Sequence, residues 1–139
     1  MSTYHYDDLS MSKSPKEFVE SYYETLRDGE PLEPYFRDVE TTVKFGISEE
    51  LYGYDETSEG LRRQTDSTRD WKAVSRDLRI FENDGYARFT DEVTLGWYHV
   101  EREDRSEFDT RWSGVMVRGS DGNGWVFTQM HVSAPHQLG

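Results

Sequence analysis

The chain of 139 residues carries 28 acidic and 16 basic side chains, has a formal net charge of −12 and contains no cysteine. Its length suits one domain, expected over residues 14–136 behind a flexible polar tail of residues 1–13, and the lack of cysteine excludes disulfides and thiolate chemistry. The negative charge repels phosphates and anionic lipids, and no apolar segment is long enough to span a bilayer, so we expect neither nucleic acid nor membrane as a partner.

The distribution of the charges points to a setting of high salt. Acidic residues are dispersed along the chain, and only four of the basic residues are lysines, whereas twelve are arginines. Molar salt shortens the Debye length to about 3 Å and removes the repulsion among such charges. We therefore favour an extreme halophile, such as a haloarchaeon, over a mesophilic source. The first residues lack the basic and apolar segments of a secretory signal, so we expect a cytoplasmic protein.

The first predicted element is an amphipathic helix. Ser14 and Glu17 form a capping box, and Pro15 occupies the first helical position. The helix is expected over residues 15–27, with a stripe of apolar residues on one side and Gly29 as its C-terminal cap. The stripe predicts that one face of this helix packs on a flat surface.

The middle of the chain predicts short elements. Residues 31–36 are rich in proline and permit no more than one or two helical turns. Residues 41–47 and 50–52 are typical of a short hairpin bounded by turn residues. Asp55 is expected to cap a polar helix that extends through Arg63, although this segment has few apolar residues.

The second half of the chain predicts long strands. They are expected at residues 73–82, 86–100, 108–118 and 125–133, with turns at residues 83–85, 101–105 and 120–124. Consecutive hairpins form an antiparallel meander, whose apolar face must be covered by a helix. We therefore predict an α+β fold in which a curved sheet wraps around the N-terminal helices and encloses a concave pocket.

The last hairpin carries the candidate binding site. Because side chains alternate along a strand, Arg111 and Ser113 share one face, and Gln129 and four candidate residues of the following strand are expected to share a face as well. The four candidates are Trp125, Phe127, His131 and Ser133. We predict that all six lie at the mouth of an aromatic-floored pocket and bind a ligand together with Tyr22 of the first helix.

His131 is the candidate catalytic residue, since imidazole titrates near neutral pH and can act as a general base. The alternative is a structural histidine that is hydrogen-bonded to Ser113, Ser133 or a backbone carbonyl. The four histidines of the chain have no metal-ligand spacing, and neither a glycine-rich phosphate loop nor a nucleophile elbow is present. We therefore expect no metal and no cofactor.

Arg111 also has two candidate roles. It could clamp a ligand carboxylate through two parallel hydrogen bonds, or it could pair with Asp91 or Glu92 on the neighbouring strand. Aromatic residues supply area that suits a flat apolar ligand, although long strands that close over a helix need many such residues in the core. They are Tyr22, Tyr23, Trp71, Trp97, Tyr98, Trp112, Trp125 and Phe127.

The predicted order of elements resembles the nuclear-transport-factor-2-like (NTF2-like) superfamily, and in particular its SnoaL-like domain proteins. The similarity covers nearly the whole of residues 14–135 and rests on Val-Lys-Phe-Gly at 43–46, Gly53, Asp-Gly-Tyr-Ala at 84–87, Arg-Trp-Ser at 111–113 and, most specifically, residues 125–135. It implies a cone with a curved mixed or antiparallel sheet, often in a homodimer packed through the sheet. Members include isomerases, cyclases, dehydratases, epoxide hydrolases and association domains, so the fold constrains function poorly.

The resemblance implies a carboxylate base for isomerases on the strand that here holds Lys44, so the missing acid argues against that activity. Similar folds open epoxides with two aspartates and an arginine, whereas here only Asp109 and Arg111 share a face. We expect a homodimer that binds an unknown small molecule, partly aromatic or carboxylate-bearing, with a hydrolase, isomerase or cyclase activity left open. The alternative is a non-catalytic association module that uses the sheet surface.

Overall fold

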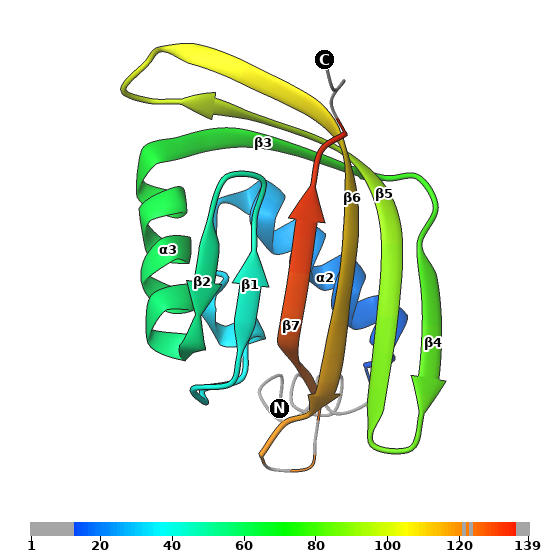
Figure 1. Cartoon of the computed structure of the whole chain (residues 1–139). Coiled ribbons are helices and arrows are strands. Elements are labelled where there is room, and N and C mark those ends of the chain that lie inside the picture. The colour runs from blue at the N-terminus through cyan, green and yellow to red at the C-terminus, as the bar shows by residue number, and fades with distance from the viewer. Residues whose placement is uncertain (1–12, 121, 123, 136–139) are drawn as a thin grey trace, which may run out of the picture.

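The fold combines one curved sheet with helices on its concave side (Figure 1). The computed structural model describes residues 13–120, 122 and 124–135, so the expected tail, except for Lys13, and the expected domain end at residue 136 lie outside the described residues. The elements are α2 (Pro15–Asp28), η1 (Glu33–Tyr35), β1 (Val43–Phe45), β2 (Glu50–Tyr52), α3 (Gly53–Ser67), β3 (Thr68–Ser75), β4 (Arg79–Asn83), β5 (Tyr86–His99), β6 (Asp104–Arg118) and β7 (Trp125–Ser133).

The sheet is mixed. Its strands lie in the order β2-β1-β7-β6-β5-β3, and β4 pairs with β5 beyond the end of β3. The β1–β7 pair is parallel, whereas every other named pair is antiparallel. The α+β class and the curved mixed sheet are therefore confirmed.

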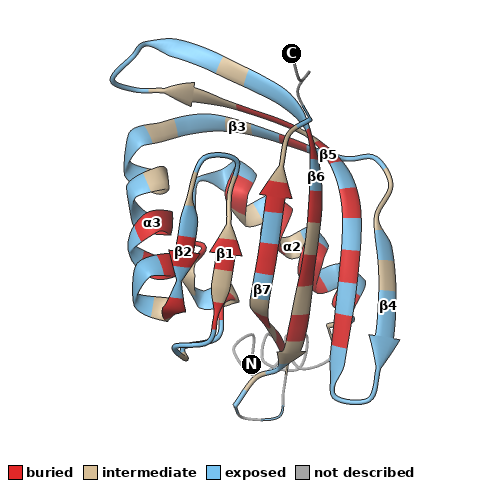
Figure 2. Ribbon diagram, viewed as in Figure 1, coloured by how far each residue is buried: buried red, intermediate tan, exposed pale blue. Residues whose placement is uncertain are grey.

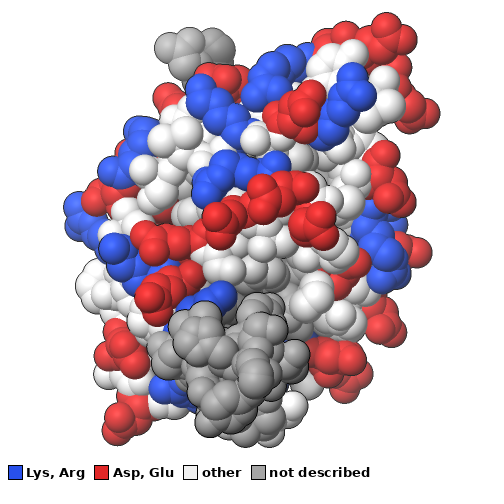
Figure 3. Space-filling view, turned by 180° about the vertical axis from the view of Figure 1, so that it is seen from behind, with Lys and Arg blue, Asp and Glu red and all other residues white. Residues whose placement is uncertain are grey.

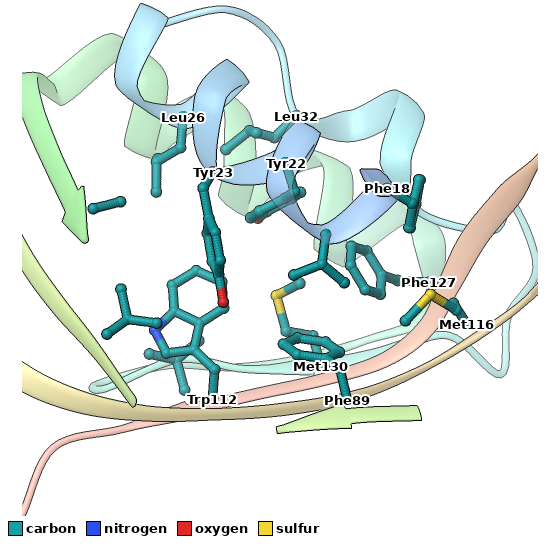
Figure 4. Close-up of a cluster of buried hydrophobic side chains, with 14 of the residues drawn as sticks. Phe18, Tyr22, Tyr23, Leu26, Leu32, Phe89, Trp112, Met116, Phe127 and Met130 are labelled. Carbon is teal, nitrogen blue, oxygen red and sulfur yellow. The ribbon is translucent and has the colours of Figure 1, made fainter. Parts of the chain in front are cut away.

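Helix α2 begins and ends as its sequence predicts. The Glu17 N–H donates to the Ser14 hydroxyl over 3.1 Å, and the Ser14 N–H donates to the Glu17 carboxylate over 2.9 Å, which confirms the capping box. Gly29 ends the helix at φ 71°, a left-handed conformation that glycine adopts without a Cβ clash. The buried stripe of α2 packs on the concave face of the sheet (Figure 4).

Helix α3 is longer than expected and begins differently. It starts at Gly53, and Asp55 lies in its first turn without capping it, while the Glu56 carboxylate accepts the N–H of Tyr52 over 2.9 Å. Small residues let the helix approach the β1–β2 hairpin closely: a Cβ on Gly60 would lie 2.7 Å from a methyl carbon of Leu51. Gly60 leaves room for the Leu51 side chain, so the helix needs no large apolar residue at this contact.

The strand expected over residues 73–82 is two strands. Residues 76–78 leave the sheet between β3 and β4, and the N–H of Asp77 donates to the buried carboxylate of Asp91 over 3.0 Å. The turn expected at residues 101–105 is shorter, because β5 extends to His99 and β6 already begins at Asp104. Figure 1 shows the far ends of β3, β5 and β6 bending over α3 and the β1–β2 hairpin.

A bulge in β7 corrects the predicted alternation of the last strand. Gln129 pairs with Val115 and Phe127 pairs with Met116, so Thr128 is an extra residue without a partner on β6. An extra residue reverses the faces of all side chains on one side of it, because the strand period is two residues.

The predicted common face of Trp125, Phe127, His131 and Ser133 is therefore wrong. Trp125 and Phe127 are buried in the core, whereas His131 is exposed and Ser133 half-buried on the opposite, convex side, where Met130 and Val132 alternate with them toward the core. Figure 2 shows buried and exposed residues alternating along the first part of β5, and buried and intermediate residues alternating along β6.

Charged side chains cover the surface. In the view of Figure 3, acids are spread across the face, with arginines and lysines between them. Most of the ion pairs within the described residues join exposed side chains, as in Lys16–Glu20 and Arg63–Glu59. None of the helices in the described part of the chain has the length and apolar character needed to cross a membrane.

Candidate functional site

The concave side of the sheet holds a pocket of about 280 Å³. It lies between α2, α3, the β1–β2 turn and the bent ends of β3 and β5. Six lining side chains supply its aromatic surface and its central polar groups: Tyr22, Lys44, Glu49, Trp71, Trp97 and Trp112. A cavity of roughly 150 Å³ accepts a benzene ring, so this pocket has room for one or two fused rings.

Two tryptophans from the bent ends of the strands form one wall. The rings of Trp71 and Trp97 stack with centroids 4.9 Å apart and planes 24° apart. The pairing of β3 with β5 shifts register between Arg69 and Lys72, and Asp70 between them has φ 54°. This bulge places Trp71 on the concave side, an arrangement often found beside binding sites.

The indole N–H groups of Trp71 and Trp97 are already hydrogen-bonded within the protein. Trp71 Nε1 donates to Thr68 Oγ1 over 2.9 Å, and Trp97 Nε1 donates to His99 Nε2 over 2.7 Å. Both rings are thereby held in place, and their carbon surfaces are available to an apolar ligand.

Trp112 of β6 is the third tryptophan of the pocket. Its Nε1 donates to Thr110 Oγ1 over 2.9 Å, and the threonine hydroxyl donates to the carbonyl of Val93 over 2.7 Å. The ring also meets Tyr23 edge-on at 5.2 Å. These contacts fix the ring before any ligand arrives.

Lys44 places a positive charge in this apolar pocket. The residue is 5% exposed, and its Nζ lies 3.0 Å from Oε2 of Glu49, whose side chain is 34% exposed. Lys44 was not predicted as a site residue, because the apolar Val43 and Phe45 beside it suggest that they face the core. The structure shows the reverse: Lys44 faces inward, and its two neighbours are half-buried on the convex side.

Tyr22 adds a neutral hydroxyl to the same pocket. Burial, and then the negative charge of Glu49, raise the pKa of its phenol, so the hydroxyl keeps its proton and remains a hydrogen-bond donor. No hydrogen bond to this hydroxyl is present within the described residues. Of the seven residues predicted to bind a ligand, Tyr22 is the one that lines this pocket.

Four of the other predicted residues come together elsewhere. Arg111, Ser113, His131 and Ser133 line a more open depression of about 590 Å³ on the convex side of the sheet. Trp125 and Phe127 line neither hollow. The predicted cluster is therefore divided among the convex face, the core and the concave pocket.

Within the described residues, Arg111 and His131 do not make the contacts that the sequence predicted for them. Asp91 faces the core, and Glu92 is paired with Arg76 at 3.7 Å rather than with Arg111. His131 makes no hydrogen bond there to Ser113, to Ser133 or to a carbonyl, and its ring meets Phe45 edge-on at 5.7 Å.

The concave pocket can therefore combine three kinds of contact with a ligand. It offers aromatic surface, the buried ammonium group of Lys44 and the phenolic donor of Tyr22; Arg63 also lines it with an exposed guanidinium paired with Glu59, and Glu49 is the only carboxylate among its described lining residues. Across the described part of the chain, no three histidine, aspartate or glutamate side chains are arranged to hold a metal ion.

Comparisons with known proteins agree with this architecture. Residues 4–137 match the family model described as a SnoaL-like domain. A search of curated proteins gave no match.

Solved structures with the same fold carry diverse descriptions. An NTF2-like superfamily protein from Salmonella enterica is 15% identical, with a TM-score of 0.76 over 88% of this chain and 89% of that one. A candidate dehydratase of the NTF2-like family from Streptomyces avermitilis is 13% identical, with a TM-score of 0.77 over 94% and 99%. A candidate association domain of a calcium/calmodulin-dependent protein kinase type II from Thiobacillus denitrificans is 11% identical, with a TM-score of 0.71 over 88% and 96%.

Proposed function

Because the chain belongs to the SnoaL-like domain family, in a fold whose sheet encloses a concave hollow, we propose that it binds a small molecule of one or two rings in the pocket between α2, α3 and β6. The observation that carries this proposal is a buried ammonium group among three tryptophans in one pocket. Ligand pockets commonly combine an apolar lining with a few fixed polar groups. These residues support binding, and Glu49, the one carboxylate among the described lining residues, is paired with Lys44 in the free protein.

Binding should appear as thermal stabilisation by neutral ring compounds such as 2-naphthol. At one hundred times the dissociation constant, a ligand of the folded state adds about 2.7 kcal/mol to the free energy of unfolding. Differential scanning fluorimetry and calorimetric titration would measure the shift and the affinity.

Two tryptophan variants locate the binding site. Gln64→Trp introduces a large ring at the wall of the concave pocket and should abolish the stabilisation, because Gln64 lines that pocket. Ser113→Trp introduces the same ring on the convex face and should leave the stabilisation intact. The reverse pattern would move the ligand to the depression that contains Arg111 and His131.

The convex face favours a second candidate function, which is association. It exposes Tyr52, Phe81 and Tyr86, each at least 40% accessible, and we infer that such a surface pairs two copies of the chain as a homodimer. A large assembly in light scattering, with no response to ring compounds, would favour a non-catalytic association module over a binding protein.

We also infer a cytoplasmic setting of high salt, as in a haloarchaeon, from the net charge of −12. The midpoint of thermal unfolding should rise by roughly 5 to 10 °C between 0.01 M and molar potassium chloride, since the Debye length falls from about 30 Å to about 3 Å. Circular dichroism across a salt series would measure the rise. A flat or falling curve would remove the argument for a halophile.

A further inference from the structure

Lys44 and Glu49 form an ion pair of unequal burial. The lysine side chain is 7% exposed, whereas the glutamate side chain is 34% exposed and belongs to the turn between β1 and β2. A buried ammonium group needs an anion beside it, and that anion can belong either to the protein or to a ligand. The more exposed partner can be rehydrated at lower cost when it leaves.

The ammonium group of Lys44 has unused capacity. It can donate three hydrogen bonds, and within the described residues its only hydrogen-bond partner is Oε2 of Glu49. Tyr22 lines the same pocket, its phenol is influenced by the charge of Glu49, and its hydroxyl makes no hydrogen bond within the described residues. Two donors are thus available to one oxygen-bearing group beside the tryptophan rings.

Glu49 is held against the hairpin rather than within the core. A Cβ on Gly46 would lie 2.8 Å from Cγ of Glu49, so the glutamate side chain lies close over this glycine. The Gly46 N–H donates to the Glu49 carbonyl over 2.9 Å, which keeps the backbone of the turn closed independently of the side chain. The carboxylate can therefore turn toward solvent without unfolding the hairpin.

On the basis of the proposed function, we propose that the ligand is an aromatic carboxylate and that Glu49 occupies the place of its carboxylate group in the free protein. The ligand's anion replaces Glu49 on Lys44, accepts a second hydrogen bond from Tyr22 and lays its ring against Trp112. Lys44 keeps a counter-ion throughout the exchange. Glu49 acts as a built-in competitor, so only ligands that carry their own negative charge gain the interaction with Lys44.

Paired probes test this exchange in the full chain. Titration calorimetry should show that 2-naphthoate binds at least about tenfold more tightly than the neutral 2-naphthamide, because charge-assisted hydrogen bonds are stronger than neutral ones. Glu49→Gln removes the competing charge and should tighten 2-naphthoate binding by a further tenfold or so, while 2-naphthamide changes less than about twofold. Lys44→Met should abolish the preference for the acid, and Lys44→Arg should retain most of it.

Glu50→Gln is the matched control for the change in net charge. Glu50 is the next residue, is exposed on β2 and does not line the pocket, so this variant should leave both affinities unchanged. Equal binding of the acid and the amide, or weaker acid binding by Glu49→Gln, would overturn the exchange while leaving ring binding intact. If no ring compound binds, the proposed function fails as well. If Lys44→Met does not fold, the affinities of Glu49→Gln and Glu50→Gln for 2-naphthoate still test the exchange, because only Glu49→Gln is expected to bind it more tightly.

Discussion

Replacing Phe127 with alanine is expected to lower the free energy of unfolding by about 3 to 5 kcal/mol, the range observed for phenylalanine truncation in a packed core. Phe127 is fully buried, and its ring centroid lies 4.8 Å from that of Phe18 and between 5.5 and 5.7 Å from those of Tyr22, Phe36 and Phe89 (Figure 4). Few of these neighbours can move into the cavity, because they pack on one another. Chemical denaturation followed by circular dichroism would measure the loss.

His131→Ala is the control for this prediction. His131 lies four residues later on the same strand, but the bulge at Thr128 places it on the convex face, where it is exposed. We expect its replacement to change the free energy of unfolding by about 0.5 kcal/mol or less. Similar losses for both variants would show that the two side chains share a face and that the bulge is absent in solution.

Asp91→Ala is expected to cost about 2 to 4 kcal/mol of folding free energy. The carboxylate is 3% exposed and accepts hydrogen bonds from the Tyr23 hydroxyl at 2.8 Å, the Ser75 hydroxyl at 2.7 Å and the Asp77 N–H at 3.0 Å. Removing it leaves three donors without their acceptor, and a buried donor without a partner costs about 1 to 3 kcal/mol. Because these donors join α2, β3 and the segment before β4, unfolding should also lose cooperativity at the sheet edge.

Glu92→Ala provides the matched comparison, since it removes the same charge from the next position of the strand. Glu92 is exposed on the other face and pairs with Arg76 at 3.7 Å, so we expect a change of about 0.5 kcal/mol or less. Denaturant titration of both variants would measure the difference. Equal effects would mean that Asp91 is not the buried acceptor described above.

Local signals in the sequence predicted much of the fold. The capping box at Ser14 and the glycine after α2 determine the first helix within one residue of its observed end. The Asp84-Gly85 turn joins β4 to β5, and Gly85, its second central residue, has a positive φ of 83°, a conformation that favours glycine. These features depend on residues that are close together in the sequence, so the sequence pattern was sufficient to predict them.

The candidate site was harder to predict because it depends on two bulges. One extra residue at Thr128 reverses the face of everything after it, and the shift near Asp70 turns Trp71 toward the pocket. Neither position carries a glycine or another local signal that marks a bulge. The inward orientation of Lys44 depends on its pairing with β7, a contact between segments more than eighty residues apart in the chain.

The parallel pairing of β1 with β7 limits the order in which the strands can join the sheet while the protein is synthesised on the ribosome. Lys44 is aligned with Met130, so the strand that carries the buried charge can join the sheet only after β7 has been synthesised. Until then β1, β2 and α3 have no neighbouring strand on that side, and the edge of β6 is open. Such long-range closure slows folding and leaves strand edges exposed in the nascent chain.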